Sequence, residues 1–185
     1  MEAWYVILGL LVVILLWNIG IYNSLIRLRQ HVRDSWSGIE TELKRRYDLI
    51  PNLVQTVKGY AAHEKEVLTS VTDARSHAVS SSGSPSDQAA DENVLVKALG
   101  NLFAVSEDYP DLKASGNFLK LQEELSNTED RIQASRRLYN GNVRDINTRI
   151  EVFPSNIIAS LFRFRRKEYF EVDEVEVSKV PTVNI

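Results

Sequence analysis

The stretch that decides the fold runs from residue 22 to residue 57 and reads YNSLIRLRQHVRDSWSGIETELKRRYDLIPNLVQTV. Its apolar residues recur at steps of three or four, which is the spacing of one stripe along an α-helix. Other helices must cover a stripe of this length, because apolar surface is unfavourable in water. The stripe consists of Tyr22, Leu25, Leu28, Val32, Trp36, Ile39, Leu43, Tyr47, Ile50, Val54 and Val57.

The residues before this stripe predict a transmembrane helix. Residues 3–22 read AWYVILGLLVVILLWNIGIY and carry no charge. At about 1.5 Å per residue they span about 30 Å, the hydrocarbon thickness of a bilayer. A cleaved signal peptide is the alternative, but Glu2 stands where positive charge is expected and no small-x-small cleavage site follows. The residues that characterise the span are Ala3, Trp4, Gly9, Trp17, Asn18, Gly20 and Tyr22.

The charges that flank the span predict its orientation. Arg27, Arg29 and Arg33 follow the span, whereas only Glu2 and the α-amino group precede it. Positive charge is retained on the cytoplasmic side of a membrane. We therefore expect a single-pass protein of the inner, or cytoplasmic, membrane with its N-terminus outside and its bundle in the cytoplasm. A bundle in the periplasm or outside is the alternative.

The first bundle helix is expected to continue directly from the membrane. No Gly or Pro lies between Gly20 and Gly38, so nothing interrupts the helical pattern there. Pro51 falls inside the stripe, and we expect it to bend the helix rather than to end it. The alternative is a fresh helix capped by Asp48 with Pro51 in its first turn. Helical spacing then resumes as far as Ala78.

Further helices are expected after a polar loop at residues 79–86. Ser84 and Pro85 resemble an N-cap and a first helical residue, and they precede a helix over residues 87–105. A helix from Phe118 to Phe153 has a period near 3.5, as in a coiled-coil seam, and Pro154 starts a short helix after it. The inward positions are Val94, Leu95, Ala98, Leu99, Leu102 and Phe103, then Leu121, Leu125, Thr128, Ile132, Ser135, Tyr139, Val143, Ile146, Ile150 and Phe153. The apolar side of the short helix consists of Ile157, Ile158, Leu161 and Phe162.

These patterns together predict an all-α fold. An N-terminal transmembrane helix, residues 1–22, is continuous with a long-helix antiparallel bundle of about four helices, residues 23–167. Residues 168–185 form a short extended tail, because acidic and apolar residues alternate there. Tyr169 and Phe170 are expected to place this tail against the bundle.

The composition argues against several functions. The formal net charge is −3, so there is no basic field for nucleic acid. The absence of cysteine excludes disulfides, thiol catalysis and a lipoprotein anchor. His63 and Glu64 begin like a zinc-protease motif, but Val67 replaces the second histidine. We expect a non-enzymatic protein without cofactor, metal or small-molecule substrate, with an unrecognised hydrolase as the alternative.

Two polar regions are candidates for contact with partners. One combines charged and polar residues around Pro51 with two residues of the helix from Phe118 to Phe153. The alternative is that its charges pair inside the bundle with Glu129 or Asp130. The other is a basic run that could meet anionic headgroups or an acidic partner. The alternative is that these are solvated charges near a helix C-terminus, where the helix dipole favours positive charge. The first region is Arg45, Arg46, Asp48, Pro51, Asn52, Lys58, Tyr139 and Asn140, and the second is Arg163, Arg165, Arg166 and Lys167.

Several motifs resemble the LemA family of bacterial membrane-anchored proteins. They are RRYDLIPNLV at 45–54, YPDLKA at 109–114, FLKLQEEL at 118–125 and FPSNIIA at 153–159. The resemblance implies an N-terminal anchor and long antiparallel helices. It also implies partners at a bilayer, since relatives are linked with membrane remodelling in magnetosome formation and with genes for a membrane zinc metallopeptidase.

Residues and resemblance together lead to one functional expectation and one alternative. We expect a membrane-tethered scaffold that assembles with itself or with a membrane partner and organises or remodels membranes. Gly9 and Gly20 would let two anchors approach closely. The alternative is an adaptor or regulator of a membrane zinc metallopeptidase, docked through the seam and residues 45–52.

Overall fold

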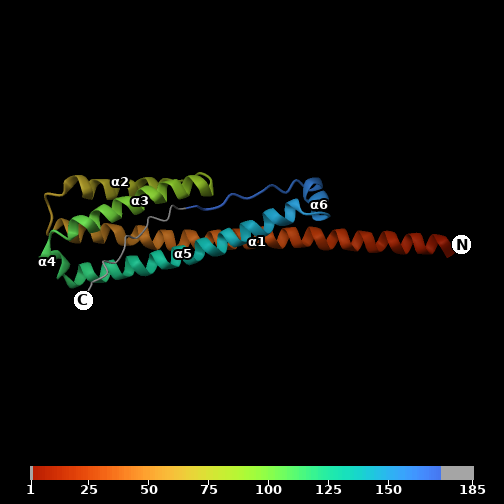
Figure 1. Ribbon diagram of the computed structural model, residues 1–185, viewed down its shortest axis with the longest axis horizontal. Coiled ribbons are helices and arrows are strands. Elements are labelled where there is room, and N and C mark those ends of the chain that lie inside the picture. Colours follow the sequence, from red (N-terminus) through yellow and green to blue (C-terminus); the bar gives the residue numbers. More distant parts are fainter. Residues whose placement is uncertain (1, 172–185) are drawn as a thin grey trace, which may run out of the picture. The chain divides into compact units, whose positions relative to one another are not determined.

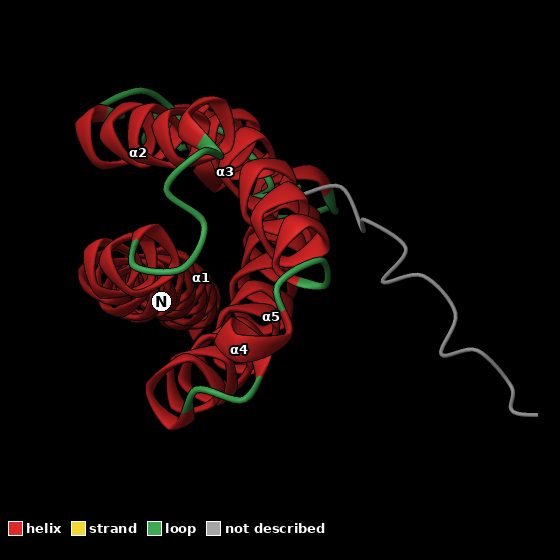
Figure 2. Ribbon diagram, turned by 90° about the vertical axis from the view of Figure 1, so that its left-hand side faces the viewer, coloured by secondary structure: helices red, strands yellow, loops and turns green. Residues whose placement is uncertain are grey.

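The computed structural model describes residues 2–171, which form six helices and no strand (Figures 1 and 2). The all-α fold is confirmed. Four of these helices are long, whereas the sequence predicts three long helices and one short helix, because it joins the first two long helices into one. Residues 168–171 are not helical, and the rest of the expected acidic tail lies outside the described residues. The helices are α1 (Glu2–Lys58), α2 (Lys65–Ser80), α3 (Pro85–Ser106), α4 (Pro110–Lys113), α5 (Gly116–Glu151) and α6 (Ser155–Leu161).

Helix α1 continues from the apolar N-terminal segment into the bundle without interruption, as expected. Pro51 lies inside the helix and does not end it, so the alternative of a fresh helix capped by Asp48 is wrong. Proline has no N–H, so the carbonyl of Tyr47 loses its helical partner. The Nε of Arg75 in α2 donates a hydrogen bond of 2.7 Å to that carbonyl, which replaces the missing bond.

The end of α1 differs from the prediction. The helix stops at Lys58 instead of continuing to Ala78, and a turn separates it from α2. In this turn the Gly59 N–H bonds to the Thr56 carbonyl at 3.2 Å and the Ala61 N–H bonds to the Val57 carbonyl at 2.8 Å. Ala61 is fully buried and lies four residues after Val57, so the turn keeps the apolar spacing of a helix and hides the break from pattern analysis.

The start of α3 is as predicted. Ser84 is the N-cap and Pro85 follows it. The Asp87 N–H donates to Ser84 Oγ at 3.3 Å, and the Ser84 N–H donates to Asp87 Oδ2 at 2.9 Å, which completes a capping box. The expectation that Val94 faces inward is wrong, since it is exposed; Glu92, three residues before Leu95, takes the buried position instead.

The described residues divide into two compact units, and each has its own core. Residues 2–39 and 135–168 form the first unit, and residues 40–134 and 169–171 form the second. In the second unit α2 and α3 lie side by side (Figures 1 and 2). Its core contains Ile50, Leu53, Val57, Ala61, Leu68, Val71, Ala74, Ala78, Leu95, Ala98, Leu99, Leu102, Leu112, Phe118 and Leu125.

In the first unit α1 and α5 run antiparallel. Asn142 Nδ2 donates to the His31 carbonyl at 3.2 Å, and the rings of Trp36 and Tyr139 lie 5.3 Å apart. From the first contact to the second the residue number rises along α1 and falls along α5, so the two helices are antiparallel, as predicted. The seam of α5 is inward as far as Ile150, but Phe153 is 78% exposed, which corrects the prediction, because α5 has already ended at Glu151.

Candidate functional site

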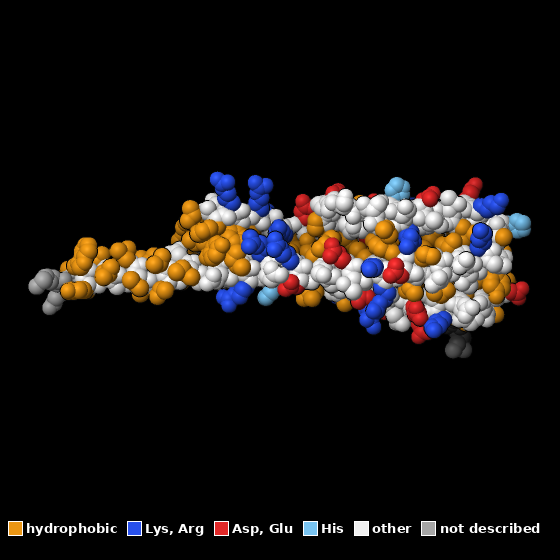
Figure 3. Space-filling view, turned by 180° about the vertical axis from the view of Figure 1, so that it is seen from behind, with side chains coloured by type: hydrophobic (Ala, Val, Ile, Leu, Met, Phe, Trp, Pro, Cys, Tyr) orange, Lys and Arg blue, Asp and Glu red, His pale blue; other side chains and the backbone are white. Residues whose placement is uncertain are grey.

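The N-terminal part of α1 has the properties of a membrane span. Among the described residues, α1 is the one helix long and apolar enough to cross a membrane. Only 6% of its most apolar stretch is buried, whereas the core helix of a globular domain is mostly buried. Large apolar side chains cover the outside of this segment (Figure 3), and they include Trp4 and Trp17.

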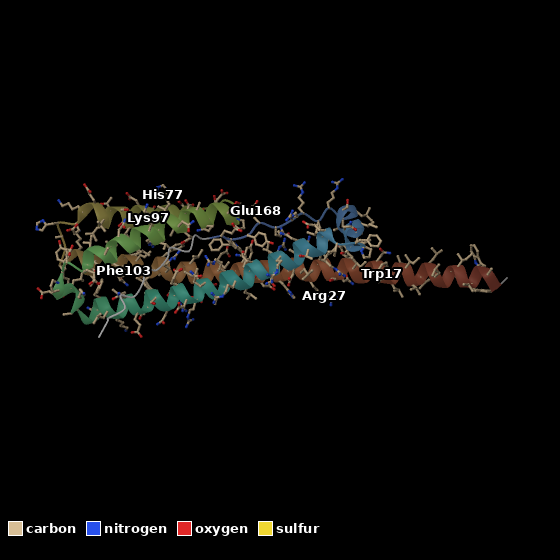
Figure 4. The ribbon with its side chains drawn as sticks, in the orientation of Figure 1. Trp17, Arg27, His77, Lys97, Phe103 and Glu168 are labelled. Carbon is tan, nitrogen blue, oxygen red and sulfur yellow. The ribbon has the colours of Figure 1, made fainter. Side chains whose placement is uncertain are left out.

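The polar and small residues of the span are compatible with lipid. Asn18 Nδ2 donates to the Ile14 carbonyl at 2.7 Å, so its own helix satisfies the amide. A Cβ atom added at Gly9 or Gly20 would meet no atom within 4 Å, so the helix surface is open at both glycines. Trp17 lies in the span, and the first basic residue, Arg27, follows it along α1 (Figure 4).

The basic run after α6 is exposed and is held by its backbone. Helix α6 ends at Leu161, and Arg163, two residues later, has a φ of 55°. The Lys167 N–H donates to Asn147 Oδ1 at 2.8 Å, and Asn147 Nδ2 donates to the Lys167 carbonyl at 2.9 Å. Arg166 lies 3.1 Å from Glu151, and both side chains are exposed. The four predicted contact residues, Arg163, Arg165, Arg166 and Lys167, all face solvent.

Tyr139 does not lie on a free surface. It is buried, and its hydroxyl donates to the Glu168 carbonyl at 2.9 Å. Burial, followed by the charge of Glu168, raises the pKa of Tyr139 to about 12. The expectation that Tyr139 contacts a partner is therefore corrected: it holds the segment after α6 against α5. Asn140 is half-buried beside it.

Arg46 is also internal, where its charge is used inside the second unit. The side chain is buried, its Nη1 donates to Glu129 Oε2 at 2.8 Å, and its Nη2 bonds to Glu92. This confirms the alternative of ion pairing to Glu129 and corrects the expectation of partner contact. An unpaired buried guanidinium would be strongly unfavourable, which is why both carboxylates face it.

Glu92 is the centre of this buried polar cluster. Its carboxylate accepts bonds from Arg46, from the Tyr47 hydroxyl and, at 2.9 Å, from Gln88 Nε2. Burial, followed by the charge of Glu92, raises the pKa of Tyr47 above its ordinary range. Sequence reasoning missed Gln88 and Glu92; the available signal was Glu92, three residues before the inward Leu95.

The remaining predicted contact residues of α1 form an exposed polar face in the second unit. Arg45 is half-exposed and lies 3.7 Å from Glu42 one turn earlier. The spacing of Arg45, Asp48 and Asn52 places them on one side of the helix. Pro51 and Lys58 are exposed as well.

The residues that resemble a zinc-protease motif have another partner. The Tyr109 hydroxyl donates to Glu64 Oε1 at 2.9 Å, and this bond raises the pKa of Tyr109. Within residues 2–171 no group of three His, Asp or Glu side chains is placed to hold a metal ion.

The fold and its surfaces define a class: an all-helical protein whose N-terminal helix carries a candidate membrane anchor and continues into a bundle. The family model of the LemA family matches residues 35–185, and the chain belongs to that family.

Relatives of two kinds align with the chain. Protein LemA from Metamycoplasma hominis is 29% identical over 89% of this chain and 75% of its own length. Magnetosome protein MamQ 2 from Paramagnetospirillum magneticum is 27% identical over 81% of this chain. Magnetosome protein MamQ from Magnetospirillum gryphiswaldense is 25% identical over 80% of this chain. The chain spans 64% of the length of each of these two MamQ proteins.

Proposed function

We propose that this protein is a non-enzymatic, membrane-anchored scaffold that assembles with itself or with another membrane protein. The observation that carries the proposal is the continuity of α1, which passes from an exposed apolar segment to buried core positions without a break. A flexible linker would let the bundle drift from the bilayer, whereas a helix holds it at a fixed distance. The arginines after the span support a cytoplasmic bundle.

The anchor offers a surface for self-association. Gly9 and Gly20 are eleven residues apart, about three helical turns, so they lie on the same side of α1. Both positions are open, and small residues on one side of a membrane helix allow a second helix to approach closely. Similarity to magnetosome proteins supports a role for such an assembly in organising or remodelling membranes.

The second surface is the exposed polar face of α1 in the second unit. Arg45, Asp48 and Asn52 alternate in charge and polarity along it, which favours a specific polar contact with a partner helix. Because Arg46 is buried and its Nη1 and Nη2 bond to Glu129 and Glu92, it belongs to the core of this unit rather than to that contact.

The test of self-assembly is the mass of the full chain extracted from membranes in a mild detergent. We expect an oligomer, and we expect Gly9→Leu with Gly20→Leu to lower its mass. The matched control, Leu11→Phe with Leu15→Phe, adds bulk on the opposite side of the helix and should leave the mass unchanged. A monomer with no co-purifying membrane protein would contradict the scaffold.

A photo-crosslinking side chain at Asn52 tests the polar face in intact membranes. We expect adducts with a second copy or with another membrane protein, and none from the same group placed at Lys97, which is exposed on α3 (Figure 4). A membrane metallopeptidase as the main adduct at Asn52 would replace the scaffold by the adaptor alternative.

A further inference from the structure

The turn after α5 and the helix α6 expose an apolar surface that no other part of residues 2–171 covers. Phe153 is 78% exposed and Leu161 is 71% exposed, and three further large apolar side chains beside them are also exposed. Patches of this kind on a soluble surface mark contacts with proteins or membranes. We call this surface the α6 patch; it consists of Val152, Phe153, Ile157, Leu161 and Phe162.

The other side of α6 is fixed to the end of the apolar span. Ile158 and Ala159 are buried in one cluster with Ile21 and Leu25 of α1. The ring of Tyr22, the last residue of the span, lies 4.6 Å from the ring of Phe162. The α6 patch therefore lies at the level where α1 leaves the hydrocarbon of the bilayer.

Basic side chains adjoin the patch. Residues 163–167 follow Phe162, the residue after α6, and expose three arginines and one lysine. On α1, Arg27 and Arg33 are exposed within three turns of Tyr22, and Arg29 lies 5.5 Å from the centre of the Phe164 ring. Figure 3 shows blue basic groups next to orange apolar surface in this region. An apolar face with basic side chains at its border is typical of an element that lies in the membrane interface.

We propose that the α6 patch is a second membrane contact, which rests on the leaflet from which α1 emerges. Its apolar side chains enter the boundary between headgroups and acyl chains, and residues 163–167 meet anionic phosphates. The proposal rests on the membrane anchoring proposed above. Lipid is the occupant favoured here because the patch is continuous with the span through Tyr22 and Phe162 and because the adjoining charge suits anionic headgroups. The first unit is then held to the bilayer at two places instead of one.

The test uses the full chain in vesicles and exploits its lack of cysteine. An environment-sensitive fluorophore is attached to the single cysteine of Phe153→Cys or of Leu161→Cys. The labelled chain is placed in vesicles of phosphatidylcholine and phosphatidylglycerol, whose lipids carry a nitroxide quencher near the headgroup. Leu11→Cys reports insertion of the span. Leu138→Cys is the matched control, because it places the same label on an exposed leucine of α5 in the same unit.

We expect blue-shifted emission and lipid quenching at Leu161→Cys and Phe153→Cys, and neither at Leu138→Cys. Water-like emission at both patch positions, with a lipid-exposed label at Leu11→Cys, would overturn this inference alone. A water-like label at Leu11→Cys would overturn the anchoring itself. A blue shift at the patch without lipid quenching would mean that protein, either a second copy or a partner, covers it, and would also overturn the inference.

The charge of the lipid gives an independent measurement. Arg165→Gln, Arg166→Gln and Lys167→Gln together should reduce quenching at Leu161→Cys on vesicles with phosphatidylglycerol, because exposed lysine and arginine are attracted to anionic lipid. On phosphatidylcholine alone the substitutions should have little effect. Equal quenching with and without the three substitutions on anionic vesicles would overturn the headgroup contact.

Discussion

At the scale of single residues, the second unit contains charges that a core normally excludes. Arg46 and Glu92 are both buried and bond to each other; Arg46 also bonds to Glu129, and Glu92 also accepts from Tyr47 and Gln88. The sequence could predict pairing of Arg46 with Glu129, because basic side chains beside a seam commonly do this. It places Glu92 on the inward side of α3, three residues before Leu95, but it does not show which basic side chain the carboxylate meets.

The ion pair leads to a prediction on stability. Glu92→Leu should lower the free energy of unfolding by about 3–5 kcal/mol, since it leaves the Arg46 guanidinium buried beside an apolar group. Arg46→Met with Glu92→Leu should recover most of the loss, because neither charge then remains. Denaturant unfolding of the detergent-solubilised chain measures both, with the exposed Arg45→Met as control. A double variant no more stable than Glu92→Leu alone would contradict the pairing.

Tyr139 leads to a prediction on pH. Its pKa in the folded protein is about 12 against an ordinary 10.0, so the native state holds the phenolic proton more tightly than the unfolded state does. The resulting stability is fully present below pH 10.0 and is lost as the pH rises towards about 12. Tyr139→Phe should therefore lose less stability than the natural chain over this window. Parallel curves of unfolding free energy against pH would contradict the assignment.

At the scale of elements, α1 shows what an apolar pattern can and cannot decide. All eleven positions of the predicted stripe are buried or half-buried, because spacing alone fixes which side of a helix is apolar. The end at Lys58 was missed because the turn at residues 59–61 preserves the spacing. Val94 and Phe153 are exposed although the pattern predicts them inward, because the burial of a side chain depends on the elements packed around it and not on its own hydrophobicity alone.

Pro51 and Arg75 lead to a prediction on α1. Arg75→Leu should lower stability by about 1.5–3 kcal/mol, because it removes a charged donor from the Tyr47 carbonyl that Pro51 leaves free. In the Pro51→Ala background the same change should cost less, since the alanine amide can bond that carbonyl. Unfolding free energies of the four chains complete the cycle, and equal losses in both backgrounds would show that Arg75 does not compensate for the proline.

At the scale of the whole molecule, the sequence predicted the membrane span from length and composition, and the exposure of that segment agrees with this. The exposed face of α6 could not be predicted. Ile157, Leu161 and Phe162 have helical spacing typical of a core, and only their position beside Tyr22 distinguishes a membrane contact from a buried face. The surfaces proposed for contact therefore consist of apolar or charged side chains that remain exposed once the contacts inside the bundle are made.

The central claim is that the apolar segment of α1 stays in the protein as its membrane anchor. The most direct measurement is the intact mass of the chain recovered from membranes washed with alkaline carbonate. The account predicts a chain in the integral membrane fraction that still contains residues 3–22. A chain that lacks these residues and is released by the wash would identify the segment as a cleaved signal and would contradict the account.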